Sequence, residues 1–119
     1  YTLCATLIKV KGENMALEHI GDASFADAVA SGITLVDFWA SWCGPCQMFG
    51  PIFEKTAEAI TDVKFVKFEV NDENRRVPAQ YGIRSIPSVL AFRDGELVEA
   101  RTGLMDQDTL EMWVAELKG

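Results

Sequence analysis

Residues 33–46 read ITLVDFWASWCGPC, and this stretch decides the fold class. Its first part, Ile33 to Ala40, is almost entirely β-branched, aromatic or otherwise apolar, with Asp37 as the exception. A run of this kind is typical of a strand that is covered on both faces in a largely parallel sheet. Cys43 and Cys46 follow at the start of a helical pattern, just past the carboxyl end of that strand. Open α/β sheets usually place their reactive groups at this position.

Cys43 and Cys46 are three residues apart, which puts them on neighbouring turns of a helix, with β-carbons about 5 to 6 Å apart and close to what a disulfide requires. Pro45 suits a first helical turn, because that turn has no hydrogen bond for proline to remove. The free amides and the positive dipole end of the helix favour a thiolate at Cys43, which we predict to be the nucleophile. Cys46 lies further along the helix on its apolar side, and we predict it to be the resolving thiol.

The alternative for this cysteine pair is half of a zinc site. Zinc generally takes four ligands, and the rest of the chain offers only His19 and Cys4 as further soft ligands. We therefore predict no metal site and a local, reactive cysteine chemistry. Cys4 has no partner at motif spacing, and we interpret it as incidental.

A helix and a second strand follow the cysteines. Apolar residues between Met48 and Ile60 fall on one helical stripe, and Pro51 inside this helix predicts a bend. Val63 to Val70 is apolar on both faces and predicts another interior strand. The two strands and the helix between them form a parallel β-α-β unit with a right-handed crossover.

Shorter signals complete the predicted fold. Upstream, Ser24 predicts the start of a short helix that Gly32 closes. Downstream, a short helix ends at Gly82, and a hairpin runs from Ser88 to Ala100 through an Asp-Gly turn. A last helix begins after Asp106 and turns an apolar face toward the sheet. The prediction is an α/β fold whose central mixed sheet combines a parallel β-α-β unit with an antiparallel hairpin, with helices on both faces.

Length and charge limit the function classes. The 119 residues suffice for one domain of ordinary size, with 49% apolar and 24% charged residues. The net charge of −7 disfavours nucleic acid and anionic membranes as partners. Residues 1–14 differ in charge from the rest and lack the features of a signal peptide. We interpret them as an N-terminal extension, a cloning remnant or a flexible arm, and residues 15–119 as the domain.

Several motifs together resemble the thioredoxin family over residues 15–119. They are VDFWASWCGPC at 36–46, Pro51, YGIRSIP at 81–87, FRDG at 92–95, and Gly103. The resemblance implies the thioredoxin fold and a thiol-disulfide oxidoreductase that reduces protein disulfides, without a bound cofactor other than its own redox-active disulfide. It also implies recharging by a thioredoxin reductase that draws on NADPH or ferredoxin. The small number of cysteines and the lack of presequence features favour a cytoplasmic protein, which we expect to be a monomer.

The resemblance implies roles for three residues beyond the cysteines. Asp37 is assigned to deprotonating Cys46 through water, and Lys67 on the next strand to modulating the charge of Asp37. A buried carboxylate needs a raised pKa or a partner, whereas the alternative for Asp37 is a strand-end carboxylate that caps a helix or faces solvent. Pro87 matches the family's cis-proline, although most X-Pro bonds are trans, and an ordinary trans proline is the alternative.

A substrate-docking rim follows from the same resemblance. It comprises Trp42, Gly44, Pro45, Ile86, Thr102 and Gly103, a mostly apolar patch to which an extended substrate segment adds as a strand. Gly44 and Pro45 bring no positive charge to the thiolate, so the motif favours the reduction of substrates. Gln47 departs from the family's usual basic residue. Trp39 is interpreted as core rather than contact.

A second function class stays open at this point. A non-catalytic binding module would use the same rim to hold a partner protein without turnover. The presence of both cysteines favours catalysis.

Overall fold

The structure is a computed structural model, and it describes residues 17–119. It is built on a five-stranded mixed sheet with the order β2-β4-β3-β5-β6. The strands β2, β3 and β4 run parallel, and β5 and β6 are antiparallel to their neighbours. The strand bounds are β2 Glu18–Ile20, β3 Ile33–Trp39, β4 Lys64–Glu69, β5 Ser88–Arg93 and β6 Glu96–Thr102. The predicted β-α-β unit and hairpin are therefore confirmed.

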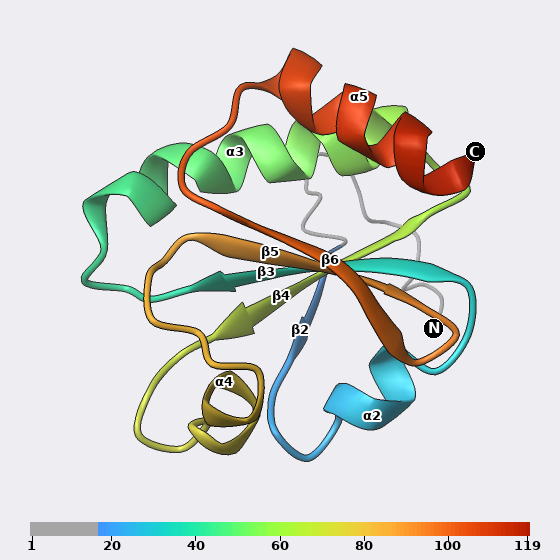
Figure 1. Cartoon of the computed structure of the whole chain (residues 1–119). Helices are drawn as coiled ribbons and strands as arrows, with labels where there is room; N and C mark the ends of the chain where they lie inside the picture. The colour runs from blue at the N-terminus through green and yellow to red at the C-terminus, as the bar shows by residue number, and fades with distance from the viewer. Residues whose placement is uncertain (1–16) are drawn as a thin grey trace, which may run out of the picture.

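Helices cover both faces of the sheet, as predicted (Figure 1). The helices α3 (Gly44–Ala59) and α5 (Gln107–Lys118) lie on one face, and α2 (Phe25–Ala28) and α4 (Arg76–Gln80) on the other. Each face has its own apolar core, one centred on Phe38 and Phe68 and the other on Phe53 and Trp113. Because β3 lies in the middle of the sheet with a core on either side, its interior residues are all buried.

The alternation of side chains along β3 places Asp37 on the α3 face. Leu35, two residues earlier on the same strand, packs with Phe49 and Phe53 of α3, whereas Phe38 packs in the opposite core. Asp37 is in register with Lys67 on β4 and with Val89 on β5. The sheet thus brings one carboxylate and one ammonium side by side beneath the helix that carries the cysteines.

Two turns use backbone conformations with positive φ. Asp94 and Gly95 have φ of 52° and 88°, which is the twist that a two-residue hairpin turn requires. Gly32 has a φ of 69°, but α2 ends at Ala28, so Gly32 does not close that helix as predicted. It lies instead in the turn before β3, where its N–H donates to the Asp94 side chain at 2.8 Å. The two turns are therefore joined at one edge of the core.

One strand was not predicted, and two further expectations were wrong. The sequence analysis missed β2, which pairs in parallel with β4 at the sheet edge and carries His19. Ser24 stands at the start of α2 but makes no capping bond to the helix; its hydroxyl accepts the N–H of Gly21 instead. Met48 was placed on the buried stripe of α3, yet it is 62% exposed. Pro51 does lie inside α3.

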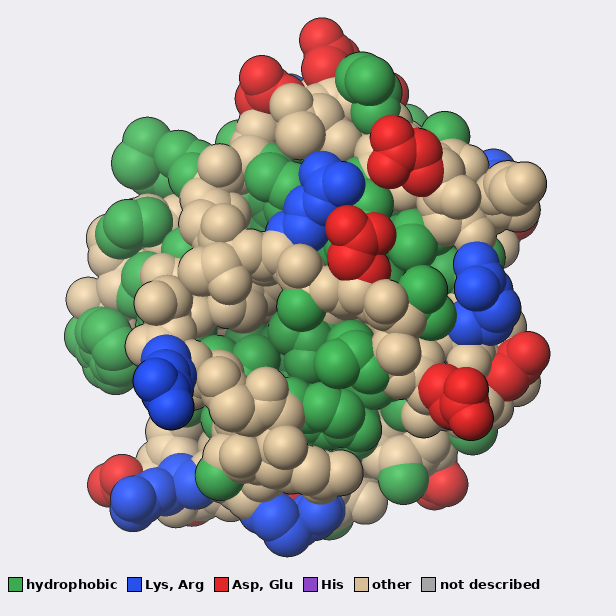
Figure 2. All heavy atoms as spheres, in the orientation of Figure 1, with side chains coloured by type: hydrophobic (Ala, Val, Ile, Leu, Met, Phe, Trp, Pro, Cys, Tyr) green, Lys and Arg blue, Asp and Glu red, His purple; other side chains and the backbone are tan. Residues whose placement is uncertain are grey.

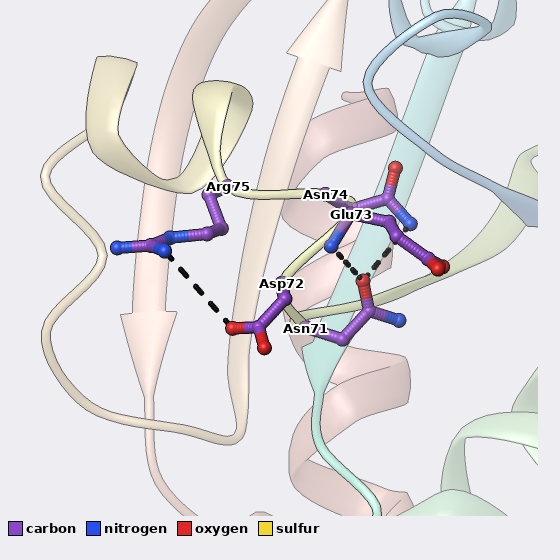
Figure 3. Close-up of polar contacts among 5 residues, drawn as sticks. All are labelled: Asn71, Asp72, Glu73, Asn74 and Arg75. Atoms are coloured by element: carbon purple, nitrogen blue, oxygen red, sulfur yellow. Dashed lines mark hydrogen bonds and ion pairs between the residues drawn. The ribbon is translucent and has the colours of Figure 1, made fainter.

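The loop after β4 is held by its own polar side chains (Figure 3). The Asn71 side-chain oxygen accepts the Glu73 N–H at 3.0 Å and the Asn74 amide at 3.4 Å. Asp22, from the turn after β2, then accepts the backbone N–H groups of Arg76 and Val77 at 2.9 and 3.0 Å. A carboxylate distant in sequence therefore caps α4, whose own N-cap residue, Arg75, makes no side-chain capping bond.

Among residues 17–119, every helix is too short or too polar to cross a membrane. The predicted boundary after residue 14 lies outside the described residues, as does Cys4.

Candidate active site

The cysteine pair occupies the junction between β3 and α3. Cys43 is the N-cap residue of α3, with Cys46 one turn further on, and the two are joined in a disulfide with 5.3 Å between their Cα atoms. The backbone N–H of Cys46 donates to the Cys43 sulfur at 3.1 Å. A sulfur that accepts an amide at a helix N-terminus is stabilised as a thiolate. Both cysteines are buried, at 6% and 4% exposure.

The first turn of α3 carries no negative side chain, which leaves its dipole uncompensated beside Cys43. Pro45 stands in this first turn, as the spacing predicts. Gln47, which takes the place of the family's usual basic residue, donates its side-chain amide to the Ser41 carbonyl at 3.0 Å. It therefore braces the loop that carries Trp42 and adds no charge to the site.

The loop before β5 lies against the cysteines. The peptide bond between Ile86 and Pro87 is cis, and the Ile86 carbonyl oxygen lies 3.8 Å from the Cys43 sulfur. The Pro87 carbonyl accepts the Gly103 N–H at 2.8 Å, which ties the end of β6 to the same loop. The structure thus places Ile86 beside the Cys43 sulfur and ties Gly103 to the adjacent Pro87.

Asp37 is a buried carboxylate, only 1% exposed. Neither of its oxygens has a hydrogen-bond partner among the described residues, so it neither caps a helix nor faces solvent. Burial raises the pKa of Asp37 to about 7; the nearby Lys67 charge lowers this pKa, and the Glu54 charge raises it. A carboxylate in this state is able to take and release a proton near neutral pH.

Lys67 is also buried, and its ammonium points to α3. It forms an ion pair with Glu54 at 3.2 Å and lies 5.3 Å from the centroid of the Trp39 ring. The sequence analysis did not identify Glu54 as a candidate site residue. The signal was available, because a Lys on an interior strand needs an anionic partner when it is buried.

The predicted rim residues lie at the surface around the disulfide. Trp42 is 76% exposed, Gly44, Pro45 and Thr102 are exposed, and Ile86 is half-buried. Met48 adds a further exposed apolar side chain near the start of α3, which the sequence analysis had placed in the core. Figure 2 shows apolar side chains gathered at the left margin, at the end of the molecule where β3 leads into α3 in Figure 1.

Trp39 supports the site from inside, as predicted. It packs against the cluster of Ala40, Cys43 and Cys46, and its ring meets that of His19 edge to face at 6.5 Å between centroids. Within residues 17–119, no three His, Cys, Asp or Glu side chains gather in a way that would hold a metal ion.

The chain is similar in sequence to known proteins over most of its length. The sequence model of the thioredoxin family matches residues 16–116. The chain belongs to this family. Thioredoxin of Bacillus subtilis is 41% identical over 98 residues, covering 82% of this chain and 93% of that protein. Thioredoxin of Chlamydia trachomatis is 42% identical over 94 residues, covering 79% and 91%.

Solved structures of the thioredoxin family agree with the fold. Thioredoxin f from spinach chloroplast superposes with a TM-score of 0.81 at 27% identity, covering 87% of this chain and 94% of that one. A mutant thioredoxin from Halobacterium salinarum gives 0.75 at 40% identity, covering 84% and 88%. Family membership and the Cys43–Cys46 disulfide together make this protein a dithiol-disulfide oxidoreductase.

Proposed function

We propose that this protein reduces disulfides in other proteins, with Cys43 as the nucleophile and Cys46 as the resolving thiol. The Cys43 thiolate attacks one sulfur of the substrate disulfide, forming a mixed disulfide and releasing the other substrate sulfur as a thiolate, which takes up a proton. Cys46 then loses its proton and attacks the Cys43 sulfur, which releases the second substrate thiolate. Two electrons pass to the substrate, and the Cys43–Cys46 disulfide is formed.

The hydrogen bond from the Cys46 N–H to the Cys43 sulfur carries this assignment of roles. This bond stabilises negative charge on the Cys43 sulfur and not on the Cys46 sulfur. Cys43 is therefore the better nucleophile and also the better leaving group. Gly44 and Pro45 are neutral and add no positive charge beside the Cys43 thiolate, which favours a cysteine pair that reduces its substrates.

Asp37 is the proposed proton acceptor for Cys46, through water, with Lys67 as the supporting charge. Its burial beneath α3 and a pKa of about 7 support this role. A general base works best with a pKa close to the working pH.

The substrate docks on the rim formed by Trp42, Ile86, Thr102 and Gly103. The exposed Trp42 ring supplies apolar contact area. An extended segment of the substrate pairs with the backbone beside Pro87, in the manner of an added strand, and presents its disulfide to Cys43.

The oxidised protein is recharged by a thioredoxin reductase linked to NADPH or ferredoxin, and it needs no cofactor beyond its own disulfide. It thus carries electrons as a monomer and contributes to redox homeostasis. A maintained dithiol requires a reducing compartment, which favours the cytoplasm. Turnover with each of the two reductase types in turn identifies the donor.

Reduction of insulin in the presence of dithiothreitol tests the proposed activity. The wild-type protein is expected to accelerate the precipitation of insulin chains, whereas Cys43→Ser and Cys46→Ser fall to the rate of dithiothreitol alone. A protein that binds insulin equally in all three forms and accelerates nothing is a binding module, and this result refutes the proposal.

A further inference from the structure

The ammonium of Lys67 is held on α3, away from the carboxylate that faces it across the sheet. Lys67 and Asp37 are register partners on β4 and β3. The Lys67 ion pair nevertheless goes to Glu54, with 3.2 Å between Nζ and Oε2, and among the described residues both Asp37 oxygens lack a hydrogen-bond partner. The cation beside Asp37 is therefore already engaged elsewhere.

Three features of α3 and β3 fix this position of the ammonium. Gly50 stands one helical turn before Glu54, on the same face of α3, and a Cβ at Gly50 would lie 3.4 Å from Lys67 Nζ. The centroid of the Trp39 ring lies 5.3 Å from the ammonium. The ammonium thus sits against the helix between Gly50, Glu54 and Trp39.

The charged groups that act on Asp37 come from β4 and α3. Lys67 faces it from β4 and Glu54 acts on it from α3, whereas its register partner on β5 is the uncharged Val89. His19 on β2 is in register with Lys67 and meets the Trp39 ring. Of these groups, Glu54 is the one that both binds the cation and adds negative charge.

We propose that Glu54 is a positioning residue, which binds the Lys67 ammonium and keeps it off the Asp37 carboxylate, so that Asp37 stays free to accept the proton of Cys46. An opposite charge that moves onto a carboxylate stabilises its ionised form and weakens it as a base. Without Glu54, Asp37 is the carboxylate that stays in register with the buried ammonium on the neighbouring strand. The inference rests on the proposed role of Asp37 in resolution.

The direct test is a carbon-13 NMR titration of the Asp37 carboxyl in the oxidised 119-residue chain, where neither motif cysteine titrates. Glu54→Gln is expected to lower the pKa of Asp37 by about one unit, the smaller end of the effect of a neighbouring cation. Glu54→Asp, which keeps the charge, is expected to restore at least half of that shift. Glu96→Gln, which removes the same charge from exposed β6, is the matched control and leaves the Asp37 pKa unchanged. An Asp37 pKa that stays constant or rises in Glu54→Gln overturns the inference.

A second measurement separates this inference from the proposed function. The pH profile for resolution of the mixed disulfide is expected to move to lower pH in Glu54→Gln by the same amount as the NMR midpoint. A profile that stays in place while the NMR midpoint moves overturns the link to catalysis. If Asp37→Asn resolves as fast as wild type, the role of Asp37 in the proposed function fails, whatever the Glu54 titration shows. Circular dichroism of each variant checks that the fold is kept.

Discussion

Asp37 and Lys67 lie side by side on the parallel strands β3 and β4, yet Lys67 makes its ion pair with Glu54 on α3. The Asp37 carboxylate is therefore buried beneath the cysteine helix without a hydrogen-bond partner among residues 17–119. A group in this position destabilises the fold when it ionises. A buried carboxylate that lowers the stability of the fold and lies beneath the cysteine helix is typical of a functional site, where the residue serves chemistry rather than stability.

Asp37→Asn is expected to slow the second step of the exchange and to spare the first. The amide has the shape of the carboxylate but accepts no proton, so Cys46 loses its base while Cys43 keeps its helix-stabilised thiolate. General bases contribute about 100-fold or more in rate, and we expect release of the mixed disulfide to slow by at least about 10-fold because water partly replaces the base. Stopped-flow separation of attack and release measures this, and equal slowing of both steps contradicts it.

The stability of the wild-type protein is expected to fall between pH 4 and pH 7. The pKa of Asp37 rises from 3.8 to about 7 on folding, so in this window the folded state binds more protons than the unfolded state. The free energy of unfolding then decreases as the pH rises, and it levels off above pH 7. Asp37→Asn lacks this dependence and gains up to about 4 kcal/mol relative to wild type across the window. Urea unfolding at pH 4, 5.5 and 8 checks the trend, and a constant difference at all three values speaks against it.

Trp42→Ala is expected to weaken substrate docking and to leave the fold alone. The side chain is 76% exposed, so its loss changes stability by less than about 0.5 kcal/mol. As a central aromatic anchor it contributes more than about 1 kcal/mol to binding, which corresponds to a KM for insulin raised about 5-fold. Met112→Ala, at the 65% exposed Met112 on α5, is the control and keeps the wild-type KM. Equal effects of the two variants would argue against a docking role.

Asp22→Ala is expected to destabilise α4 by about 1 kcal/mol, the usual effect of removing a cap. Slight burial of Asp22 raises its pKa, but the N–H groups of Val77 and Arg76 outweigh this and lower the pKa below 3.8. The cap is therefore present above pH 4 and is lost as the pH falls below 3.8, through the pKa of the folded state. Thermal melts at pH 7 and pH 3 measure the difference, which is expected to shrink at pH 3.

Periodicity and turn chemistry predicted the central elements of the fold. Three patterns each favour one structure: the apolar run before the cysteines favours a strand, the stripe that follows favours a helix, and Asp94-Gly95 favours a hairpin turn. The structure contains all three. Asp106 caps α5 as predicted, accepting the Thr109 N–H at 2.8 Å. The position of the cysteine pair could be predicted in the same way, because the two cysteines lie at the junction of two such elements.

The remaining features depend on tertiary contacts that sequence patterns do not encode. The strand β2 is three residues long, too short for an alternation, and it forms because the edge of β4 is there to pair with. Met48 fits a buried stripe by spacing, yet its side chain is 62% exposed, although its neighbour Phe49 is buried. The ion pair of Glu54 with Lys67 requires the crossing of α3 over β4, which places residues 13 apart in contact.

Covalent capture of a substrate tests the central assignment most directly. Reduced Cys46→Ser and Cys43→Ser, each also carrying Cys4→Ser so that a single thiol remains, are mixed with oxidised insulin and resolved by non-reducing mass spectrometry. Cys46→Ser is expected to accumulate a one-to-one mixed disulfide through Cys43 that dithiothreitol releases, whereas Cys43→Ser accumulates little. A stable adduct through Cys46 in Cys43→Ser, with none in Cys46→Ser, contradicts the account.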